Sequence, residues 1–219
     1  MKIRSRVKSL AIASTGAANL ASVAALCRRA GIEMNITDDP DLLLEAPYAL
    51  LPGVGAFGPA MKRLEDTKLG KAFVARIADR KPTMGICLGM QLMCESSAEA
   101  PGTAGLGVVK ASVQKLAAGP GAPLPQLGWN EVRPSSPACF VRAGWAYFAN
   151  SYALSFIPQP FAGSTAVYGR EFVASLELWS DKDDVAPYLL LCQFHPELSG
   201  PWGLALFRRW MGVGQTGEL

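Results

Sequence analysis

The chain contains 219 residues, of which 50% are hydrophobic and 18% are charged, a composition that excludes a disordered protein and predicts a compact α/β protein. The net charge is only +3 and the Lys and Arg residues are scattered, so neither a nucleic acid nor a membrane surface is an expected partner. No linker-like stretch divides the chain, and we expect a single domain over residues 1–219 with its core at about 7–211.

Strand and helix patterns alternate in the first half of the chain, which predicts crossover units on a parallel sheet. The expected strands are 7–13, 34–37, 48–51 and 83–86, and the expected helices are 20–30, 59–79 and 88–95. Residues 38–40 are expected to form a turn and residues 95–102 a loop. The side chains expected to face inward from the helix 59–79 are Met61, Leu64, Leu69, Phe73, Ile77 and Ala78.

The second half of the chain contains further strand patterns and one more helix. A strand is expected at 108–116 and another in the apolar run that ends at His195. The stretches 165–168 and 172–176 predict a hairpin around Gly169. A last helix is expected at 202–211, with a frayed end after it.

The cysteine and histidine content limits the chemistry that the chain offers. Five cysteines without paired metal spacing fit a reducing compartment, and a single histidine leaves no zinc set. The apolar stretch after the basic segment 1–8 is interrupted too early for a signal peptide, and no apolar run is long enough to span a bilayer. We therefore expect a cytoplasmic protein without a metal or another cofactor. Four cysteines are expected to be core or near-core thiols: Cys27, Cys94, Cys139 and Cys192.

Cys87 lies where a short buried strand is expected to turn sharply into a helix. Gly85 and Gly89 flank it at both second neighbours, and small neighbours allow a nucleophile to stand on a strained strand-to-helix turn. The N-terminus of the following helix favours the thiolate, which is the nucleophilic form. A small core hydrophobe is the alternative interpretation of such a cysteine. The flanking pattern favours a catalytic nucleophile.

A cysteine nucleophile needs a base, and the chain has one histidine, His195. It follows an apolar run of strand length that Pro196 terminates, so it is expected at a strand end, where α/β folds place chemistry. Glu197 is close enough in sequence to hold the imidazole through its second nitrogen and to stabilise the imidazolium. A histidine satisfied by the backbone, beside a solvated Glu197, is the alternative.

Together these stretches resemble the Cys-His-Glu triad of the class I glutamine amidotransferases, with GICLGMQ at 85–91 and QFHPE at 193–197. Further stretches are similar to the glutaminase subunit of imidazole glycerol phosphate synthase: LPGVGAFGPAM at 51–61, GWN at 128–130, YF at 147–148, SY at 151–152 and SG at 199–200. The resemblance extends from about residue 7 to residue 211.

The resemblance implies a three-layer fold with a mostly parallel central sheet, flanking helices and an additional antiparallel β portion. It also implies an enzyme in which Cys87, His195 and Glu197 hydrolyse L-glutamine to glutamate and ammonia. The implied partner is a (β/α)₈-barrel cyclase that forms a heterodimer with the chain. That pair would make imidazole glycerol phosphate and an aminoimidazole carboxamide ribotide in histidine biosynthesis.

The glycine-rich stretch after the strand 48–51 offers backbone N–H groups to a ligand, although an ordinary glycine-rich turn is the alternative. An acyl-transfer site needs such donors for its oxyanion. We expect one donor at Leu88 and a second among Gly53, Val54 and Gly55. The resemblance places Gln91 and Glu99 in the glutamine pocket, and for Glu99 a solvated loop acid is the competing interpretation.

By resemblance, Asn19, Trp129 and Tyr147 border the partner-facing opening and the ammonia route. A helix N-cap is the alternative for Asn19, and core packing is the alternative for the two aromatic residues. The positions that depart from the family pattern are Ser14, Ala18, Gln126, Asn150 and Leu198.

Two other functions are consistent with this sequence. One is a glutaminase of the same fold that serves a different amidating synthase, because several of the departures are at positions expected to face a partner. The other is a non-catalytic regulatory subunit, against which the intact triad argues.

Overall fold

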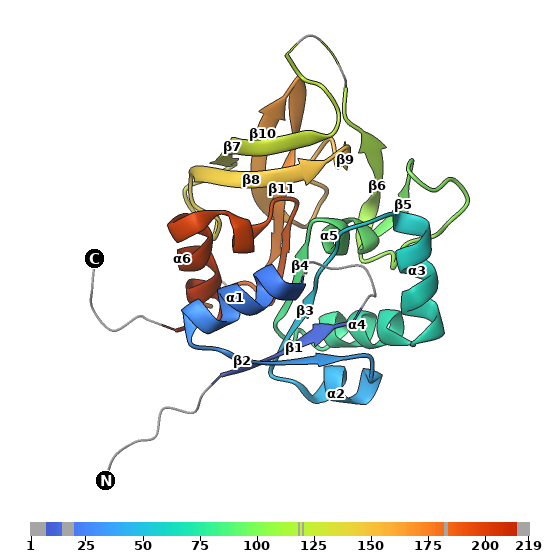
Figure 1. Ribbon diagram of the computed structural model, residues 1–219, viewed down its shortest axis with the longest axis vertical. Coiled ribbons are helices and arrows are strands. Elements are labelled where there is room, and N and C mark those ends of the chain that lie inside the picture. The colour runs from blue at the N-terminus through green and yellow to red at the C-terminus, as the bar shows by residue number, and fades with distance from the viewer. Residues whose placement is uncertain (1–7, 15–19, 118, 120, 182–183, 214–219) are drawn as a thin grey trace.

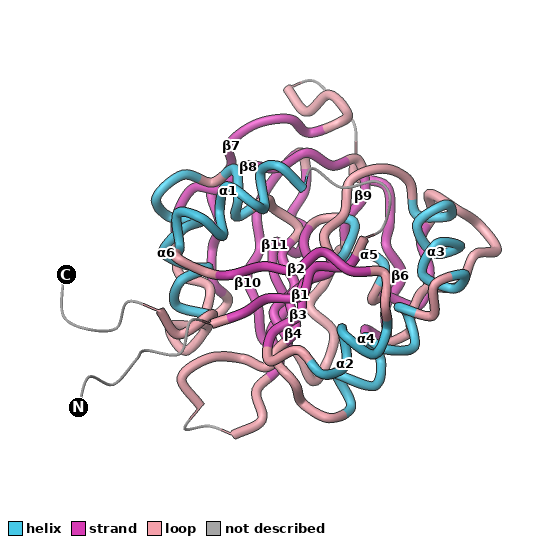
Figure 2. The backbone as a smooth tube through the Cα atoms, turned by 60° about the horizontal axis from the view of Figure 1, so that its bottom comes forward, coloured by secondary structure: helices cyan, strands magenta, loops and turns pink. Residues whose placement is uncertain are grey.

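The computed structural model describes residues 8–14, 20–117, 119, 121–181 and 184–213. A nine-stranded sheet forms its centre, with helices on both sides (Figures 1 and 2). In spatial order its strands are β2 (Glu33–Thr37), β1 (Ser9–Ala13), β3 (Tyr48–Leu51), β4 (Thr83–Ile86), β12 (Leu189–Cys192), β11 (Arg170–Leu178), β10 (Ala162–Tyr168), β7 (Gln126–Pro134) and β8 (Gly144–Asn150). A smaller sheet contains β5 (Cys94–Ser97), β6 (Val109–Lys115) and β9 (Tyr152–Ala153).

The large sheet has a parallel half and an antiparallel half. Strands β2, β1, β3, β4 and β12 are paired in parallel, as the alternating strand and helix patterns predict. From β12 onward the pairings through β11, β10, β7 and β8 are antiparallel. The antiparallel β portion is thus an extension of the parallel sheet, and the expected α/β class is confirmed.

Two hydrophobic cores cover the two faces of this sheet. Successive strand residues point to opposite faces, so Leu50 and Leu190 lie in one core while Leu51 and Leu191 lie in the other. Helices α1 (Leu20–Ala30) and α6 (Gly200–Trp210) pack in the first core (Figure 1). The second core contains α2 (Pro40–Glu45), α3 (Phe57–Asp66), α4 (Leu69–Ala78) and α5 (Leu88–Leu92).

The predicted bounds of three elements agree with the structure: those of the helix 20–30 and of the strands 48–51 and 83–86. The predicted helix 59–79 is wrong as one helix, because Lys68 has a φ of 61° between α3 and α4. L residues rarely adopt this left-handed conformation, and a continuous helix cannot contain it. Ala78 is exposed and Met61 is half-buried, so the expected inward face is wrong at Ala78.

Two other predictions in this half are corrected. The expected turn at 38–40 leads directly into helix α2, whose first turn Asp39 caps through its carboxylate with Pro40 at the first helical position. The expected helix 88–95 ends at Leu92, and the chain continues as strand β5 beside β6. Pairing with β6, a tertiary contact, overrides the helical spacing after Leu92.

The remaining strands are present with shifted ends. The hairpin strands and β2 are longer than predicted, β6 is one residue shorter at each end, and β1 begins at Ser9 and β12 ends at Cys192, inside the predicted stretches. The hairpin consists of β10 and β11, joined at Gly169 with a φ of +69°, a backbone conformation that favours glycine. The last helix starts at Gly200, ahead of the predicted residue 202. No helix within the described ranges is both long and apolar enough to cross a membrane.

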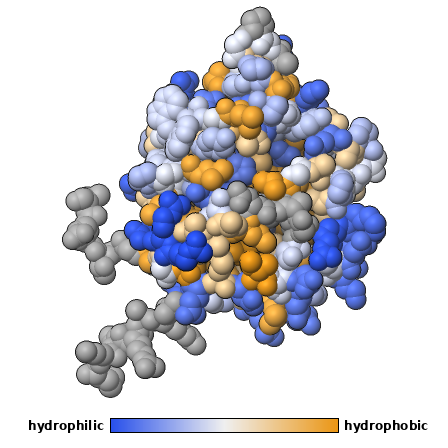
Figure 3. All heavy atoms as spheres, viewed as in Figure 1, coloured by the Kyte–Doolittle hydropathy of each residue, from blue (hydrophilic) through white to orange (hydrophobic). Residues whose placement is uncertain are grey.

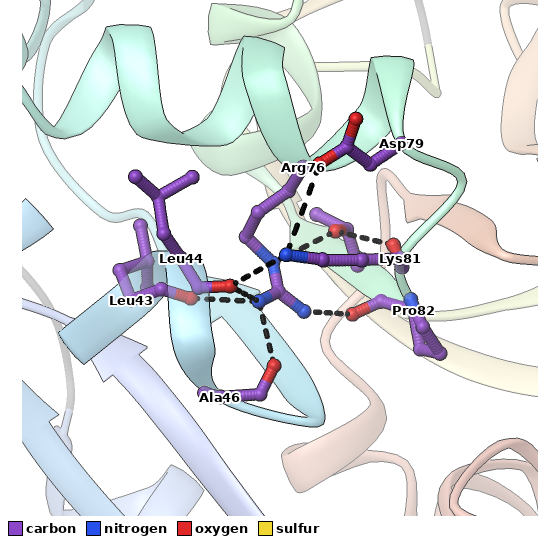
Figure 4. A network of polar contacts seen from close by, with 8 residues as sticks. Leu43, Leu44, Ala46, Arg76, Asp79, Lys81 and Pro82 are labelled. Atoms are coloured by element: carbon purple, nitrogen blue, oxygen red, sulfur yellow. Dashed lines mark hydrogen bonds and ion pairs between the residues drawn. The ribbon is translucent and has the colours of Figure 1, made fainter. Parts of the chain in front are cut away.

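A buried arginine links three elements of the parallel half (Figure 4). Arg76 of α4 has no exposed surface, and its guanidinium donates to the carbonyls of Leu43 and Ala46 at 2.7 Å and of Pro82 at 2.9 Å. Burial lowers the pKa of Arg76 to about 10, so the group remains charged at neutral pH. Arg76 therefore joins the end of α2 to the residue that precedes β4, the strand that leads to Cys87.

Candidate active site

Cys87 lies between β4 and α5, on the strand-to-helix turn that the sequence predicts. Its φ of 51° and ψ of −110° are rare for a residue with a side chain and cost on the order of 1–3 kcal/mol. The N–H of Cys87 donates to the carbonyl of Cys192 at 2.7 Å. Its own carbonyl accepts from the N–H groups of Met90 at 3.0 Å and Gln91 at 3.2 Å, which begins the helix. These bonds hold the strained turn in place.

Glycines allow the segments around Cys87 to approach one another closely. A Cβ atom at Gly89 would lie 2.0 Å from the carbonyl oxygen of Leu51, and one at Gly53 would lie 2.5 Å from Cβ of Leu88. A Cβ at Gly85 would meet the carbonyl oxygen of Gly89 at 3.0 Å. A side chain at Gly53 or Gly89 would therefore push the turn away from the end of β3 and the loop that follows it, and one at Gly85 would crowd the turn itself. The role expected for Gly85 and Gly89 has a direct steric cause.

The order of the strands brings the histidine next to the cysteine. Strand β12 is the parallel neighbour of β4, and the register pairs Ile86 with Cys192. Cys87 and Gln193 thus leave the sheet at the same edge, at the carboxyl ends of adjacent parallel strands, and His195 follows. The proximity of Cys87 and His195 depends on the order of the strands in the sheet, and no local sequence pattern reveals that order.

His195 and Glu197 form a buried pair. His195 Nδ1 lies 2.8 Å from Glu197 Oε1, and each side chain is 4% exposed. The backbone of His195 is held on both sides: its N–H donates to the Tyr147 carbonyl at 2.9 Å, and its carbonyl accepts from the Ser199 hydroxyl at 2.7 Å. His195 Nε2 is buried and has no hydrogen-bond partner among the described residues. Since Glu197 occupies Nδ1, Nε2 is the nitrogen left for a reacting group.

The environment of His195 favours its charged form. Burial acts to lower the pKa of His195, because it disfavours the charged form. The nearby sulfur of Cys87 and the carboxylate of Glu197 act in the opposite direction and outweigh burial, so the pKa of His195 rises to about 10. At neutral pH the imidazole of His195 is therefore protonated on both nitrogens and positively charged.

A cavity of about 300 Å³ opens in front of Cys87 and His195. The loop after β3, the start of α5 and the end of β8 provide its walls. Its other lining residues are Val54, Gly55, Leu88, Gln91, Glu99, Pro125, Ala149, Asn150, Ser151 and Tyr152. The cavity is at the lower end of the size range of small-molecule sites, and a cysteine and a protonated histidine reach into it.

Three of the four residues expected to supply oxyanion donors line this cavity, and the fourth contacts one of them. Leu88, Val54 and Gly55 line it, and Gly53 packs directly against Leu88. Gly55 has a φ of +107°, a conformation that favours glycine. The segments that contain the proposed donors, the loop 53–55 and Leu88, are thus brought close together.

Gln91 and Glu99 both line the cavity, as expected from the resemblance. The Gln91 amide nitrogen donates to the Tyr152 carbonyl at 2.9 Å, which fixes the side chain. Glu99 is half-buried, and its carboxylate accepts from the N–H of Phe57 at 2.9 Å. The interpretation of Glu99 as a merely solvated loop acid is therefore wrong, because the carboxylate is anchored at the N-terminus of α3.

The two aromatic residues of the expected opening contact each other outside the core. Trp129 of β7 and Tyr147 of β8 are opposite each other, with ring centroids 6.3 Å apart in an edge-to-face arrangement. Trp129 is 53% exposed and Tyr147 is half-buried, so core packing does not account for Trp129. Asn19 lies outside the described residues.

Two residues that depart from the family pattern are opposite each other at the end of the β7–β8 pair. Gln126 and Asn150 are paired in register, and both are buried. Within the described part of the chain, neither Gln126 Oε1 nor Asn150 Oδ1 has a hydrogen-bond partner. Asn150 also lines the cavity, so this departure is located at the site itself. Neither side chain can act as a base.

Gln193 is a site residue to which sequence analysis assigned no role. It is fully buried, and its amide nitrogen lies 3.6 Å from Cys87 Sγ. The signal in the sequence was a polar residue that ends an apolar run two positions before His195. In the ranges that the structure covers, no group of three or more His, Cys, Asp or Glu side chains has an arrangement suited to a metal ion.

Comparison with known proteins agrees with this arrangement. A protein-family model described as glutamine amidotransferase class-I matches residues 23–132. A solved structure described as a glutamine amidotransferase superposes with a TM-score of 0.71 at 16% identity, covering 93% of this chain and 99% of that one. The structure of PurLQS from Thermotoga maritima gives a TM-score of 0.70 at 14% identity, covering 94% of this chain and 98% of that chain. These two similarities show the fold.

The fold and the site define an enzyme of the class I glutamine amidotransferases. Imidazole glycerol phosphate synthase subunit HisH from Exiguobacterium sibiricum is 38% identical over 92% of this chain and 93% of its own length. The proteins of the same name from Symbiobacterium thermophilum and Streptococcus gordonii are 37% and 35% identical, each over about nine-tenths of both chains. The chain belongs to the family of imidazole glycerol phosphate synthase subunit HisH, within the class I glutamine amidotransferases, and the family expected from the sequence is confirmed.

Proposed function

We propose that the chain is a glutaminase in which Cys87, His195 and Glu197 hydrolyse the side-chain amide of L-glutamine. The observation that carries this proposal is the placement of Cys87 and His195 on one small cavity, with Glu197 Oε1 2.8 Å from His195 Nδ1. A cysteine beside a histidine that a third group orients is the arrangement of nucleophilic acyl transfer.

In the first half of the reaction, Cys87 Sγ attacks the amide carbon of glutamine. Negative charge develops on the carbonyl oxygen, toward the N–H groups of Leu88 and of the loop 53–55. His195 Nε2 then donates its proton to the departing nitrogen, the C–N bond breaks, and ammonia leaves a thioester on Cys87. Glu197 keeps the imidazole in the orientation that aims Nε2 at the reacting atoms.

In the second half, water replaces ammonia. His195, now neutral, accepts a proton from the water as its oxygen attacks the thioester carbon. The C–S bond breaks, glutamate is released, and the proton returns the site to its starting state. Glu99 and Gln91 hold the substrate from the cavity wall, where the Glu99 carboxylate suits the α-ammonium group of glutamine.

We further propose that the ammonia passes to a (β/α)₈-barrel cyclase, with which the chain forms a heterodimer in histidine biosynthesis. At neutral pH free ammonia would mostly become ammonium, which is not a nucleophile, so direct transfer to a partner is needed. The relatives are named as subunits of a synthase, which supports a partner. We also propose that residues 7–211 form one domain, since one sheet extends from β1 to β12.

Exposed aromatic residues near the site support the presence of a partner. The upper part of the molecule, which contains β7 and β8, presents pale residues interspersed with orange ones (Figure 3). Leu127, Trp129 and Trp145 are exposed by 65%, 53% and 59%, and the register of β7 and β8 places them on one face with Tyr147. The backbone carbonyl of Tyr147 accepts the hydrogen bond from the N–H of His195. Exposed aromatic residues grouped on one face are typical of protein interfaces.

Glutamate production from glutamine tests the proposal, with the chain alone and with a histidine-pathway cyclase and its nucleotide substrate. We expect strong stimulation by the cyclase, and no turnover in Cys87→Ala with an unchanged unfolding temperature. Turnover retained in Cys87→Ala would refute the role of Cys87. Glutamate production that the cyclase does not change would still support the glutaminase function, but it would favour a different amidating synthase as the partner.

A further inference from the structure

A chain of buried amide groups connects the cavity wall to the sulfur of Cys87. Gln91 Nε2 donates to the carbonyl oxygen of Tyr152 at 2.9 Å and to Gln193 Oε1 at 3.0 Å. Gln193 Nε2 in turn lies 3.6 Å from Cys87 Sγ. Gln193 has no exposed surface, and its backbone N–H donates to the carbonyl of Ala174 at 2.9 Å.

The Tyr152 carbonyl fixes the orientation of the side-chain amides of Gln91 and Gln193. A backbone carbonyl oxygen only accepts hydrogen bonds, so the Gln91 atom that faces Tyr152 must be the amide nitrogen. The same nitrogen faces Gln193, so the Gln193 atom at that contact must be the oxygen. Gln193 therefore presents its NH₂ group to Cys87. The sulfur has a fixed donor on the side of β12.

We propose that Gln193 is a positioning residue of the glutaminase site, whose amide N–H holds the sulfur of Cys87 as a thiolate directed into the cavity. The inference deepens the proposed function and rests on it, since it assigns a role to a residue behind the nucleophile. A hydrogen bond to the ionised sulfur is stronger than one to the neutral thiol, so the donor favours the nucleophilic form. Gln193 also links the thiolate to Gln91, which lines the cavity.

The effect of Gln193 on the sulfur of Cys87 differs from that of the other neighbouring groups. The titratable groups near Cys87 are His195 with Glu197 behind it, Glu99 and Tyr152 on the cavity wall, and Cys192 on β12. As a thiol, Cys87 Sγ also donates to the Ala149 carbonyl at 3.8 Å, a contact that the ionised sulfur cannot make. His195 acts on the sulfur by charge, whereas Gln193 is a neutral donor held in a fixed place. Loss of Gln193 should therefore leave the histidine pair intact and reduce the thiolate population.

Alkylation of Cys87 by iodoacetamide as a function of pH tests the proposal without requiring glutamine turnover. The reaction is followed at the Cys87 peptide by mass spectrometry, because Cys139 is more exposed than Cys87 and reacts as well. In Gln193→Met, which has similar length and no donor, we expect the pH midpoint of the alkylation to rise by about one unit. In Gln193→Glu, which adds a negative charge, we expect a larger rise. The glutaminase kcat should fall about tenfold in Gln193→Met, with a smaller change in KM.

A matched control is Gln114→Glu, the same change at an exposed position on β6. It should leave the alkylation midpoint and the kcat unchanged. An unchanged midpoint in a folded Gln193→Met or Gln193→Glu variant would overturn the proposal, because a residue that only fills the core does not act on the thiolate. An unchanged alkylation midpoint would overturn the proposal even if the kcat of the variant were lost.

A measurement on the unmutated protein covers the case in which both variants fail to fold. Methylthiolation of Cys87 removes the thiolate, and one glutamine side-chain NH₂ signal should then shift in the ¹⁵N NMR spectrum. Absence of any shift among the glutamine NH₂ signals would overturn the proposal. The two proposals fail separately. The alkylation and NMR measurements report on the contact between Gln193 and Cys87 even in a protein that does not hydrolyse glutamine, whereas glutamate production tests the glutaminase function.

Discussion

The Nδ1 atom of His195 lies 2.8 Å from Oε1 of Glu197, and both side chains are 4% exposed. Cys87 together with this Glu197 carboxylate raises the pKa of the single histidine of the chain to about 10. Because no other histidine contributes signals, one titration measures this pair alone.

The first prediction is that His195 titrates far above the ordinary range. In ¹⁵N NMR spectra the imidazole should have a midpoint near pH 10, in line with the raised pKa of His195. In Glu197→Gln the carboxylate charge is lost, so the midpoint should fall toward the ordinary value of 6.5. A midpoint near 6.5 in the unmutated protein would contradict the arrangement.

The same pair predicts how stability depends on pH. The folded state raises the pKa of His195, so it binds the proton more tightly than the unfolded chain does. This stabilisation is fully present below pH 6.5 and is lost as the pH rises through about 10. The difference in free energy of unfolding between the protein and His195→Gln should shrink from pH 6 to pH 10 in urea titrations. A constant difference would exclude the linkage.

The second prediction concerns the close contact between Gly89 and Leu51. In Gly89→Ala the added Cβ would lie 2.0 Å from the Leu51 carbonyl oxygen, so the turn and the end of β3 must separate. We expect a loss of about 2 kcal/mol in the free energy of unfolding and a large loss of kcat.

Gly58→Ala is the control for Gly89→Ala. Gly58 is in helix α3, and a Cβ there would meet its nearest neighbour at 3.6 Å, an ordinary contact. Stability should be unchanged or slightly higher, because alanine is the better helix former. Equal stability losses in the two variants would show that the steric argument is wrong.

The third prediction concerns the buried guanidinium of Arg76. Arg76→Met leaves the carbonyls of Leu43, Ala46 and Pro82 without their donor, so we expect a loss of about 3 kcal/mol in the free energy of unfolding. Lys81→Met is the control: Lys81 also donates to a carbonyl of α2, that of Leu44, but its side chain is 43% exposed. That change should cost less than about 1 kcal/mol. Chemical denaturation measures both, and similar losses would contradict the prediction.

The fourth prediction is that Trp129 contributes to the binding of the cyclase. Trp129→Ala should weaken binding at least about tenfold, as expected for an exposed tryptophan near the centre of an interface. Phe156→Ala is the control, because Phe156 is 58% exposed but belongs to the segment between β9 and β10 and not to β7 or β8. Calorimetric titration with the cyclase measures both. Equal effects, or none at Trp129, would remove this face from the proposed interface.

The sequence by itself determined the elements that local patterns encode. Apolar runs bounded by glycine and proline predicted β3, β4 and α1 with their observed bounds, and the glycines around Cys87 predicted its strand-to-helix turn. The motifs around Cys87 and His195 identified the family. Prediction failed where the local signal was weak or was overridden, as at Lys68, where the backbone turns left-handed between two amphipathic helices, and after Leu92, where strand pairing ends a helix.

Only the tertiary structure decided how distant segments meet. The placement of β12 beside β4 brings His195 to Cys87, and the packing of Gly53 against Leu88 joins the expected oxyanion donors. The hydrogen bonds from Gln91 through Gln193 to the sulfur, and those of Arg76 to distant carbonyls, also connect residues that are far apart in sequence. Local residue preferences specify turns and helices, whereas such contacts depend on strand order and close packing, which only the folded chain establishes.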